Sequence, residues 1–122
     1  MADVLVIDDD PLICEMIEMT LTGLGHTVRK AGTGLSGLLA TLDQLPDLVL
    51  LDMRLPGLDG YTVARQLTSG KSGKAVPILA VTAHDSPEDY DAAYKAGCTG
   101  FLAKPFDTVH LIVAVPQQLQ GK

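Results

Sequence analysis

Short apolar runs alternate along the chain with longer segments in which apolar residues recur every three or four positions. Three of the runs are rich in aliphatic and β-branched residues, and each leads into a polar residue: Val4–Ile7 before Asp8, Leu48–Leu51 before Asp52, and Ile78–Val81 before Thr82. Weaker strand candidates are Thr27–Lys30 and Gly100–Ala103. Because successive residues of the runs are apolar, both faces of the strands should be buried, as in a parallel sheet covered by helices.

Helix signals fill the intervals between these strands. Asp10 and Ser86 are expected N-caps, each followed by a proline at the first helical position, and Asp59 before Gly60 marks a third helix that runs to about Leu67. The first helix should end at Gly25 and bury an apolar stripe made of Ile13, Met16, Ile17, Leu21 and Leu24.

The remaining segments have weaker signals. A second helix is expected over roughly Leu35–Leu45, ending before Pro46, and the fourth helix should close at Gly97. The fifth begins near Asp107 and Thr108, and Pro116 is expected to kink it or end it early. The Gly-, Ser- and Lys-rich stretch Ser69–Lys74 is typical of a solvated loop.

Five strands alternating with five helices predict an α/β fold. The expected architecture is a doubly wound five-stranded parallel sheet in the flavodoxin-like order 2-1-3-4-5, with helices on both faces. The 122 residues fit one domain, so we expect a single unit over 1–122 with no second, output domain. In such sheets ligands bind beyond the carboxyl ends of the strands, near the first and third strands, where the winding reverses.

The residues at those strand ends carry the candidate chemistry. Asp8, Asp9 and Asp52 would repel one another unless a positive group lay among them, and Mg²⁺ suits carboxylate oxygens and accepts a phosphate oxygen as well. Lys104 at the end of the fifth strand offers a second positive charge, and Thr82 offers a hydroxyl. Acids, a lysine and a hydroxyl at one edge predict a site for a phosphoryl group on a carboxylate, that is, an aspartyl phosphate.

Charge and composition limit the partners, the state of the cysteines and the cellular location that we expect. The formal net charge of −6 argues against nucleic acid or an anionic membrane as the main partner. Cys14 and Cys98 form no Cys-x-x-Cys pair and lie far in sequence from the histidines, which favours two free thiols over a zinc site. No signal peptide and no long apolar run is present in the sequence, so we expect a cytoplasmic protein.

Four segments together resemble the receiver domains of two-component response regulators. They are Val6-Ile7-Asp8-Asp9-Asp10-Pro11, Leu51–Gly60, Val81-Thr82-Ala83 and Lys104-Pro105-Phe106. The resemblance covers essentially the whole chain, with the motifs in order and at the right spacing. It is closest to single-domain receivers of the chemotaxis-regulator or phosphorelay type.

The resemblance implies a role for each matching position. Asp52 would be the phosphoacceptor; Asp9, Asp52 and the backbone carbonyl of Met53 would ligate Mg²⁺ (or Mn²⁺), with Asp8 helping through water. Thr82 and Lys104 would contact the phosphoryl oxygens, and the Lys104–Pro105 bond would be cis. Phe101 would be the aromatic switch that turns inward when Thr82 moves. Arg54 and His84 would set the lifetime of the phosphoryl group.

The resemblance also implies partners. A sensor histidine kinase or a histidine phosphotransfer protein would donate the phosphoryl group. A downstream protein, whose identity the sequence does not reveal, would bind a face formed by the fourth helix, fifth strand and fifth helix. The chain would not be an enzyme, because it catalyses only its own phosphorylation and dephosphorylation. Alternatives within the family are a phosphorelay shuttle and a receiver fragment of a hybrid histidine kinase.

Three departures from the commoner family pattern bear on these roles. Phe101 stands where tyrosine is frequent, so its signal would depend on packing alone. Arg54 and His84 are larger than the usual residues at their positions. The segment Gly97–Phe101 lacks the acidic pair typical of DNA-binding regulators that dimerise through this face.

Three other classes of protein fit the sequence less well. A flavin-binding electron carrier would need a Gly- and hydroxyl-rich phosphate loop where this chain has three aspartates. A phosphatase with an aspartyl nucleophile would need an acid where Arg54 stands. A degenerate receiver that only binds partners would have lost Asp52, Asp9 or Lys104, and this chain has all three.

Overall fold

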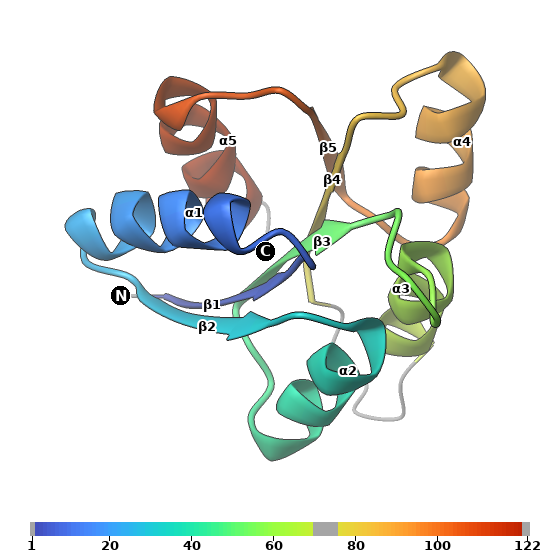
Figure 1. Ribbon diagram of the computed structural model, residues 1–122, viewed down its shortest axis with the longest axis horizontal. Coiled ribbons are helices and arrows are strands. Elements are labelled where there is room, and N and C mark those ends of the chain that lie inside the picture. Colours follow the sequence, from blue (N-terminus) through green and yellow to red (C-terminus); the bar gives the residue numbers. More distant parts are fainter. Residues whose placement is uncertain (1, 70–75, 121–122) are drawn as a thin grey trace.

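The computed structural model describes residues 2–69 and 76–120. The chain alternates strand and helix: β1 Asp3–Ile7, α1 Pro11–Gly23, β2 Thr27–Ala31, α2 Gly34–Asp43, β3 Leu48–Asp52, α3 Gly60–Thr68, β4 Ile78–Thr82, α4 Pro87–Lys95, β5 Gly100–Ala103 and α5 Thr108–Gln120. The five strands form one parallel sheet in the order β2-β1-β3-β4-β5 (Figure 1). The predicted fold class and strand order are confirmed.

The sheet separates two hydrophobic layers. On β1, Leu5 and Ile7 pack toward α2, α3 and α4, whereas Val4 and Val6 pack toward α1 and α5 (Figure 1). All five residues of β3 and of β4 are buried. This burial on both faces is what the uninterrupted apolar runs predict for central strands of a parallel sheet.

Local signals set most helix boundaries. The side chains of Asp10, Asp59 and Ser86 accept hydrogen bonds from backbone N–H groups of the first turn of α1, α3 and α4, as predicted. The cap of α2 is Thr33, which exchanges hydrogen bonds with Ser36 in a capping box that the sequence analysis did not identify. The stretch Ser69–Lys74, predicted as a loop, lies outside the described residues except for Ser69, the C-cap of α3.

Two expectations about the helices are wrong. α5 continues through Pro116 to Gln120 instead of ending early. Proline removes the N–H that would bond to the carbonyl of Ile112, but both residues are exposed, so water can satisfy that carbonyl. In α1 the buried residues are Cys14, Ile17 and Leu21, whereas Leu24 is exposed because it lies beyond the last helical turn.

Within the described ranges, no helix combines the length and the apolar character needed to cross a membrane.

Candidate functional site

The register of the sheet brings the predicted residues to one edge. Ile7 lies opposite Leu51, so Asp8 follows β1 beside Asp52, the last residue of β3. On the other side, Asp52 lies opposite Val81 and Thr82 lies opposite Ala103. Thr82 therefore lies one position beyond the residue opposite Asp52, and Lys104 lies one position beyond the residue opposite Thr82. All three stand at the same carboxyl edge of the sheet.

Three carboxylates meet at this edge. Asp8, Asp9 and Asp52 each offer an oxygen, and these oxygens lie within 4.8 Å of one another. Asp8 and Asp52 are only 3% and 5% exposed, whereas Asp9 is exposed on the loop that follows β1. Buried like charges at this separation repel one another unless a cation is bound among them.

Lys104 provides one such cation. Its Nζ lies 3.0 Å from Asp8 Oδ2 and 3.3 Å from Asp52 Oδ2, and its side chain is 19% exposed. Burial alone lowers the pKa of Lys104, but the negative charges of Asp8 and Asp52 outweigh it and raise that pKa above its usual value. Lys104 is therefore held charged, and a single positive charge faces three carboxylates.

Asp52 is held in a fixed orientation from two sides. Its Oδ1 accepts a hydrogen bond of 2.9 Å from the backbone N–H of Arg54, and its Oδ2 accepts one from Lys104. Burial raises the pKa of Asp52 and the charge of Asp8 adds to this rise, against the opposing effects of the Arg54 N–H and Lys104. The ionised carboxylate of Asp52 is thus under electrostatic strain that a further cation would relieve.

Gly60 lets the first turn of α3 pack against the backbone of Asp52. A Cβ atom at position 60 would lie 2.6 Å from the carbonyl oxygen of Asp52 and 2.5 Å from the Cα of Met53. The Gly60 N–H also makes a long hydrogen bond, 3.4 Å, to the carbonyl of Met53. Any larger side chain at position 60 would push α3 away and displace the acceptor strand end.

Asp8 shows the clearest sign that the site is built for a further positive group. Its Oδ1 accepts from the backbone N–H of Asp10, but its buried Oδ2 has no hydrogen-bond donor among the described residues, although Lys104 lies near it as an ion pair. A buried carboxylate oxygen without a donor is costly. The donor set, two buried carboxylates and one exposed carboxylate, is the oxygen-rich kind that Mg²⁺ prefers.

The remaining predicted residues surround the acceptor. Thr82 is 1% exposed, and its Oγ1 accepts from the N–H of His84 at 3.3 Å. The side chains of Arg54 and His84 are exposed at the rim. Arg54 also lines a hollow of about 430 Å³ together with Met53, Leu55, Pro56, Asp59 and Tyr61.

Phe101 has a neighbour that the sequence analysis missed. It lies on β5, and its ring packs against that of Tyr90 of α4, with ring centroids 4.1 Å apart and the ring planes tilted by 54°. Tyr90 stands four residues after the predicted cap Ser86, and no sequence spacing links it to position 101, because the pair forms only when α4 packs beside β5. The predicted cis peptide bond between Lys104 and Pro105 is confirmed.

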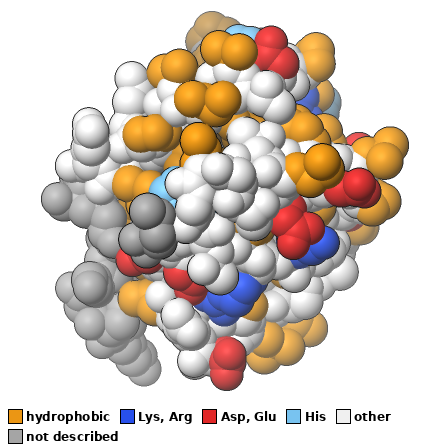
Figure 2. Space-filling view, turned by 90° about the vertical axis from the view of Figure 1, so that its left-hand side faces the viewer, with side chains coloured by type: hydrophobic (Ala, Val, Ile, Leu, Met, Phe, Trp, Pro, Cys, Tyr) orange, Lys and Arg blue, Asp and Glu red, His pale blue; other side chains and the backbone are white. Residues whose placement is uncertain are grey.

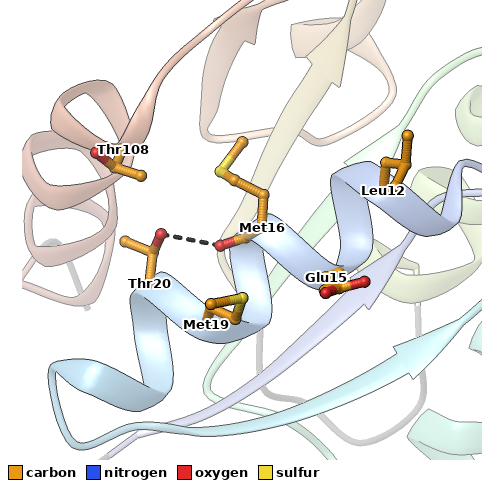
Figure 3. A pocket seen from close by; sticks show the side chains of 6 residues that line it. All are labelled: Leu12, Glu15, Met16, Met19, Thr20 and Thr108. Atoms are coloured by element: carbon orange, nitrogen blue, oxygen red, sulfur yellow. Dashed lines mark hydrogen bonds between the residues drawn. The ribbon is translucent and has the colours of Figure 1, made fainter.

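An apolar groove lies beside the acidic edge, between α1 and α5. It has a volume of about 410 Å³ and is lined by Leu12, Glu15, Met16, Met19, Thr20 and Thr108 (Figure 3). Leu12 is 75% exposed and stands two residues after Asp10, so the groove begins close to the acidic edge. Figure 2, seen from the side on which α1 and α5 lie, shows hydrophobic side chains gathered toward its upper part.

Comparison with known proteins identifies the family. Residues 4–116 match the response regulator receiver domain family. Protein PilH of Pseudomonas aeruginosa is 34% identical over 121 residues, which cover 99% of this chain and 100% of PilH. The structure of the chemotaxis response regulator CheY4 of Vibrio cholerae superposes with a TM-score of 0.92 at 30% identity, covering 97% of this chain and 98% of that one.

Other relatives are longer. The probable transcriptional regulatory protein TcrX of Mycobacterium tuberculosis is 38% identical over 110 residues, 90% of this chain but 46% of TcrX. The chain spans about half the length of the first curated relatives that it matches.

The doubly wound sheet with acids, a threonine and a lysine at its carboxyl edge thus defines a class of phosphoacceptor signalling domains. The chain belongs to the response regulator receiver domain family of two-component signalling.

Proposed function

We propose that Asp52 is the phosphoacceptor and that phosphorylation there requires Mg²⁺ or Mn²⁺. The observation that carries this proposal is the meeting of three carboxylate oxygens within 4.8 Å, with Lys104 paired to only two of these acids among the described residues. Asp9, Asp52 and the carbonyl of Met53 would hold the metal, and Asp8 would act through water. When bound, the ion neutralises charge on the acids and on the incoming phosphoryl group.

The transfer step follows from the geometry of the acceptor. An oxygen of the ionised Asp52 attacks the phosphorus of a phosphohistidine; a P–O bond forms, the P–N bond breaks, and the leaving imidazole takes up a proton. The Arg54 N–H and Lys104 aim the carboxylate before attack. Lys104 and the Thr82 hydroxyl would bind phosphoryl oxygens; this is supported by their position at the same carboxyl edge of the sheet as Asp52.

We infer that Thr82 and Phe101 transmit the effect of phosphorylation from Asp52 to the surface of the protein. If Thr82 moves toward a phosphoryl oxygen, the space behind it opens and Phe101 turns inward, which takes away the ring on which Tyr90 stacks. The surface of α4, β5 and α5 then changes shape, and a downstream protein reads that change. Phe101 has no hydroxyl, so the change depends on packing.

The phosphodonor is a sensor histidine kinase or a histidine phosphotransfer protein, acting in the cytoplasm. The groove between α1 and α5 supports docking of such a partner, because it is apolar and begins beside the acidic edge (Figure 3). Beyond its own phosphorylation and dephosphorylation we propose no catalysis. The chain could serve equally as a stand-alone regulator, a phosphorelay shuttle or the receiver of a hybrid histidine kinase.

A small phosphodonor such as acetyl phosphate tests the assignment without any kinase. In Mg²⁺ buffer we expect one phosphoryl group per chain by intact mass spectrometry, and peptide mapping should place it on Asp52. Chelation of the metal and the substitution Asp52→Asn should each abolish labelling. Equal labelling of Asp52→Asn, or labelling of the wild type on another residue, contradicts the proposal.

A further inference from the structure

Helix α2 approaches the core closely at two glycines, beside the partly buried Leu38 and Ala40. Its two buried residues are Gly34 and Gly37. A Cβ atom at Gly37 would lie 2.4 Å from Cδ1 of Ile7, and one at Gly34 would lie 2.6 Å from the carbonyl oxygen of Leu58. The helix backbone therefore lies directly on the core, and no larger residue fits at either position.

Leu38 of α2 packs against the core, but three other leucines of the helix face solvent. Leu35, Leu39 and Leu42 are 60%, 56% and 82% exposed, and Leu45, just past the helix, is also exposed. The first three are separated by four and then three residues, so they form one stripe along the helix, with the spacing of a two-helix seam. The name leucine stripe is used below for Leu35, Leu39 and Leu42.

The leucine stripe differs from the exposed apolar residues of α1. On α1, Leu12 and Met19 are accompanied on the outer surface by Glu15 and Glu18. On α2 no charged residue occurs between Ala31 and Leu42, although the whole chain carries a net charge of −6. The leucine stripe is thus a surface on which two copies of this acidic chain can approach without bringing like charges together.

The ends of α2 favour one orientation of such a pair. The amino end, capped by Thr33, carries the positive end of the helix dipole, and the carboxyl end carries the acid Asp43. In an antiparallel pair, each Asp43 lies near the amino end of the other helix. Charge complementarity therefore favours an antiparallel contact between two identical helices, and the stripe spacing is compatible with it.

We propose that this protein forms a homodimer through its leucine stripe, with α2 of one copy antiparallel to α2 of the second and Leu39 near the twofold axis. A contact of three or four leucines on each side buries less than the ~1,200 Å² typical of stable interfaces, so the dimer is weak and concentration-dependent. A partner of opposite charge fits less well, because the stripe offers no acid to attract it. The proposal does not depend on the chemistry of Asp52, and Asp52→Asn should dimerise like the wild type.

Sedimentation velocity from micromolar to millimolar protein tests the dimer. We expect the wild type to shift from monomer toward dimer as concentration rises. Leu39→Glu should weaken dimerisation by at least about tenfold, the effect expected for a central interface residue. Leu12→Glu on α1 is the matched control, since it adds the same charge at another exposed leucine, and it should dimerise like the wild type.

Cross-linking gives a second readout that does not depend on a loss of binding. Cys14 and Cys98 are buried, so the wild type should not react with a short bis-maleimide. Leu39→Cys should give covalent dimers rapidly, and Leu12→Cys should give them at the rate of random collision. A wild type that is monomeric at every concentration overturns the proposal, even if α2 then proves to bind another protein. So does a dimer that Leu39→Glu leaves intact, or equal cross-linking of the two cysteine variants.

Discussion

The aspartates at the two ends of the sheet differ in how far their negative charge is matched by neighbouring donors. At the amino end, Asp3 of β1 is matched by Arg29 of β2, whose Nε donates to Oδ1 at 3.1 Å and whose Nη2 donates to Oδ2 at 2.8 Å. Gln44 adds a third donor to Asp3, and the Asp3 N–H donates to Asp47 at 2.8 Å. Every carboxylate oxygen of Asp3 therefore has a partner.

At the carboxyl end, three aspartates lie together, and Lys104 pairs with two of them, Asp8 and Asp52. The buried oxygen of Asp8 has Lys104 as its ion-pair partner, and burial raises the pKa of Asp52. The same residue type thus supports the fold where its charge is matched and forms the proposed metal site where its charge is in excess. Substitutions at the amino end should change stability alone, and those at the carboxyl end should change the response to metal and phosphoryl donors.

The largest stability loss is expected for Arg29→Ala at the amino end. Arg29 holds Asp3 and also donates to the carbonyls of Ala40 and Gln44 at the end of α2, so its removal takes two donors from a partly buried acid and one donor from each carbonyl. Urea unfolding should show a loss of about 2–3 kcal/mol, with the stabilisation by Mg²⁺ retained.

Lys95→Ala is the control for this substitution, because Lys95 pairs with Asp91 entirely at the surface of α4. It should leave stability within error of the wild type. An Arg29→Ala protein as stable as Lys95→Ala would show that the amino end is not held by this network.

Asp52→Asn should instead stabilise the metal-free protein, raising its melting temperature by a few degrees. The pKa of Asp52 is raised, so its ionised form costs stability, and that cost builds up as pH rises from the unfolded-state pKa to the folded-state pKa. Melting temperatures measured against pH without metal should therefore show the wild type approaching Asp52→Asn as pH falls. A destabilised Asp52→Asn at neutral pH would refute the excess of negative charge.

Lys104→Ala should separate phosphorylation from the conformational response. Phosphoryl transfer should continue at a reduced rate, because the metal still neutralises charge, but the tether from the acceptor edge to β5 is lost. The chemical shifts of Tyr90 and Phe101, which stack on each other, report the response. A fully phosphorylated Lys104→Ala whose aromatic shifts move as in the wild type would rule out this role.

The smallest effect is expected at the rim. Arg54 is exposed beside the acceptor, and its guanidinium can lie over phosphoryl oxygens and obstruct an attacking water. Decay of the phosphorylated protein after the donor is removed should be about 2–10-fold faster in Arg54→Ala, and less affected by His84→Ala. Arg65→Ala, an exposed arginine on α3, is the control. An unchanged or slower decay in Arg54→Ala would show that it does not shield the bond.

The sequence predicted those features that depend on strand ends and caps. Because parallel strands end at one edge, Asp8, Asp52, Thr82 and Lys104 could be placed together from position along the chain alone. The stacking of Tyr90 on Phe101 could not, since it depends on how α4 packs beside β5. The outward leucines of α2 were missed for a related reason: the apolar pattern of that helix indicates burial, and only the contact of Gly37 with Ile7 shows which side is covered.

A thermal melt with and without millimolar Mg²⁺, performed on the wild type, Asp9→Asn and Asp3→Asn, tests most directly the claim that the carboxyl end is a metal-dependent phosphorylation site. A ligand that binds only the folded state raises its melting temperature. We predict that Mg²⁺ raises the melting temperature of the wild type and, from a lower baseline, of Asp3→Asn, but not that of Asp9→Asn. A wild type that does not respond to Mg²⁺, or equal responses of Asp9→Asn and Asp3→Asn, would contradict the account.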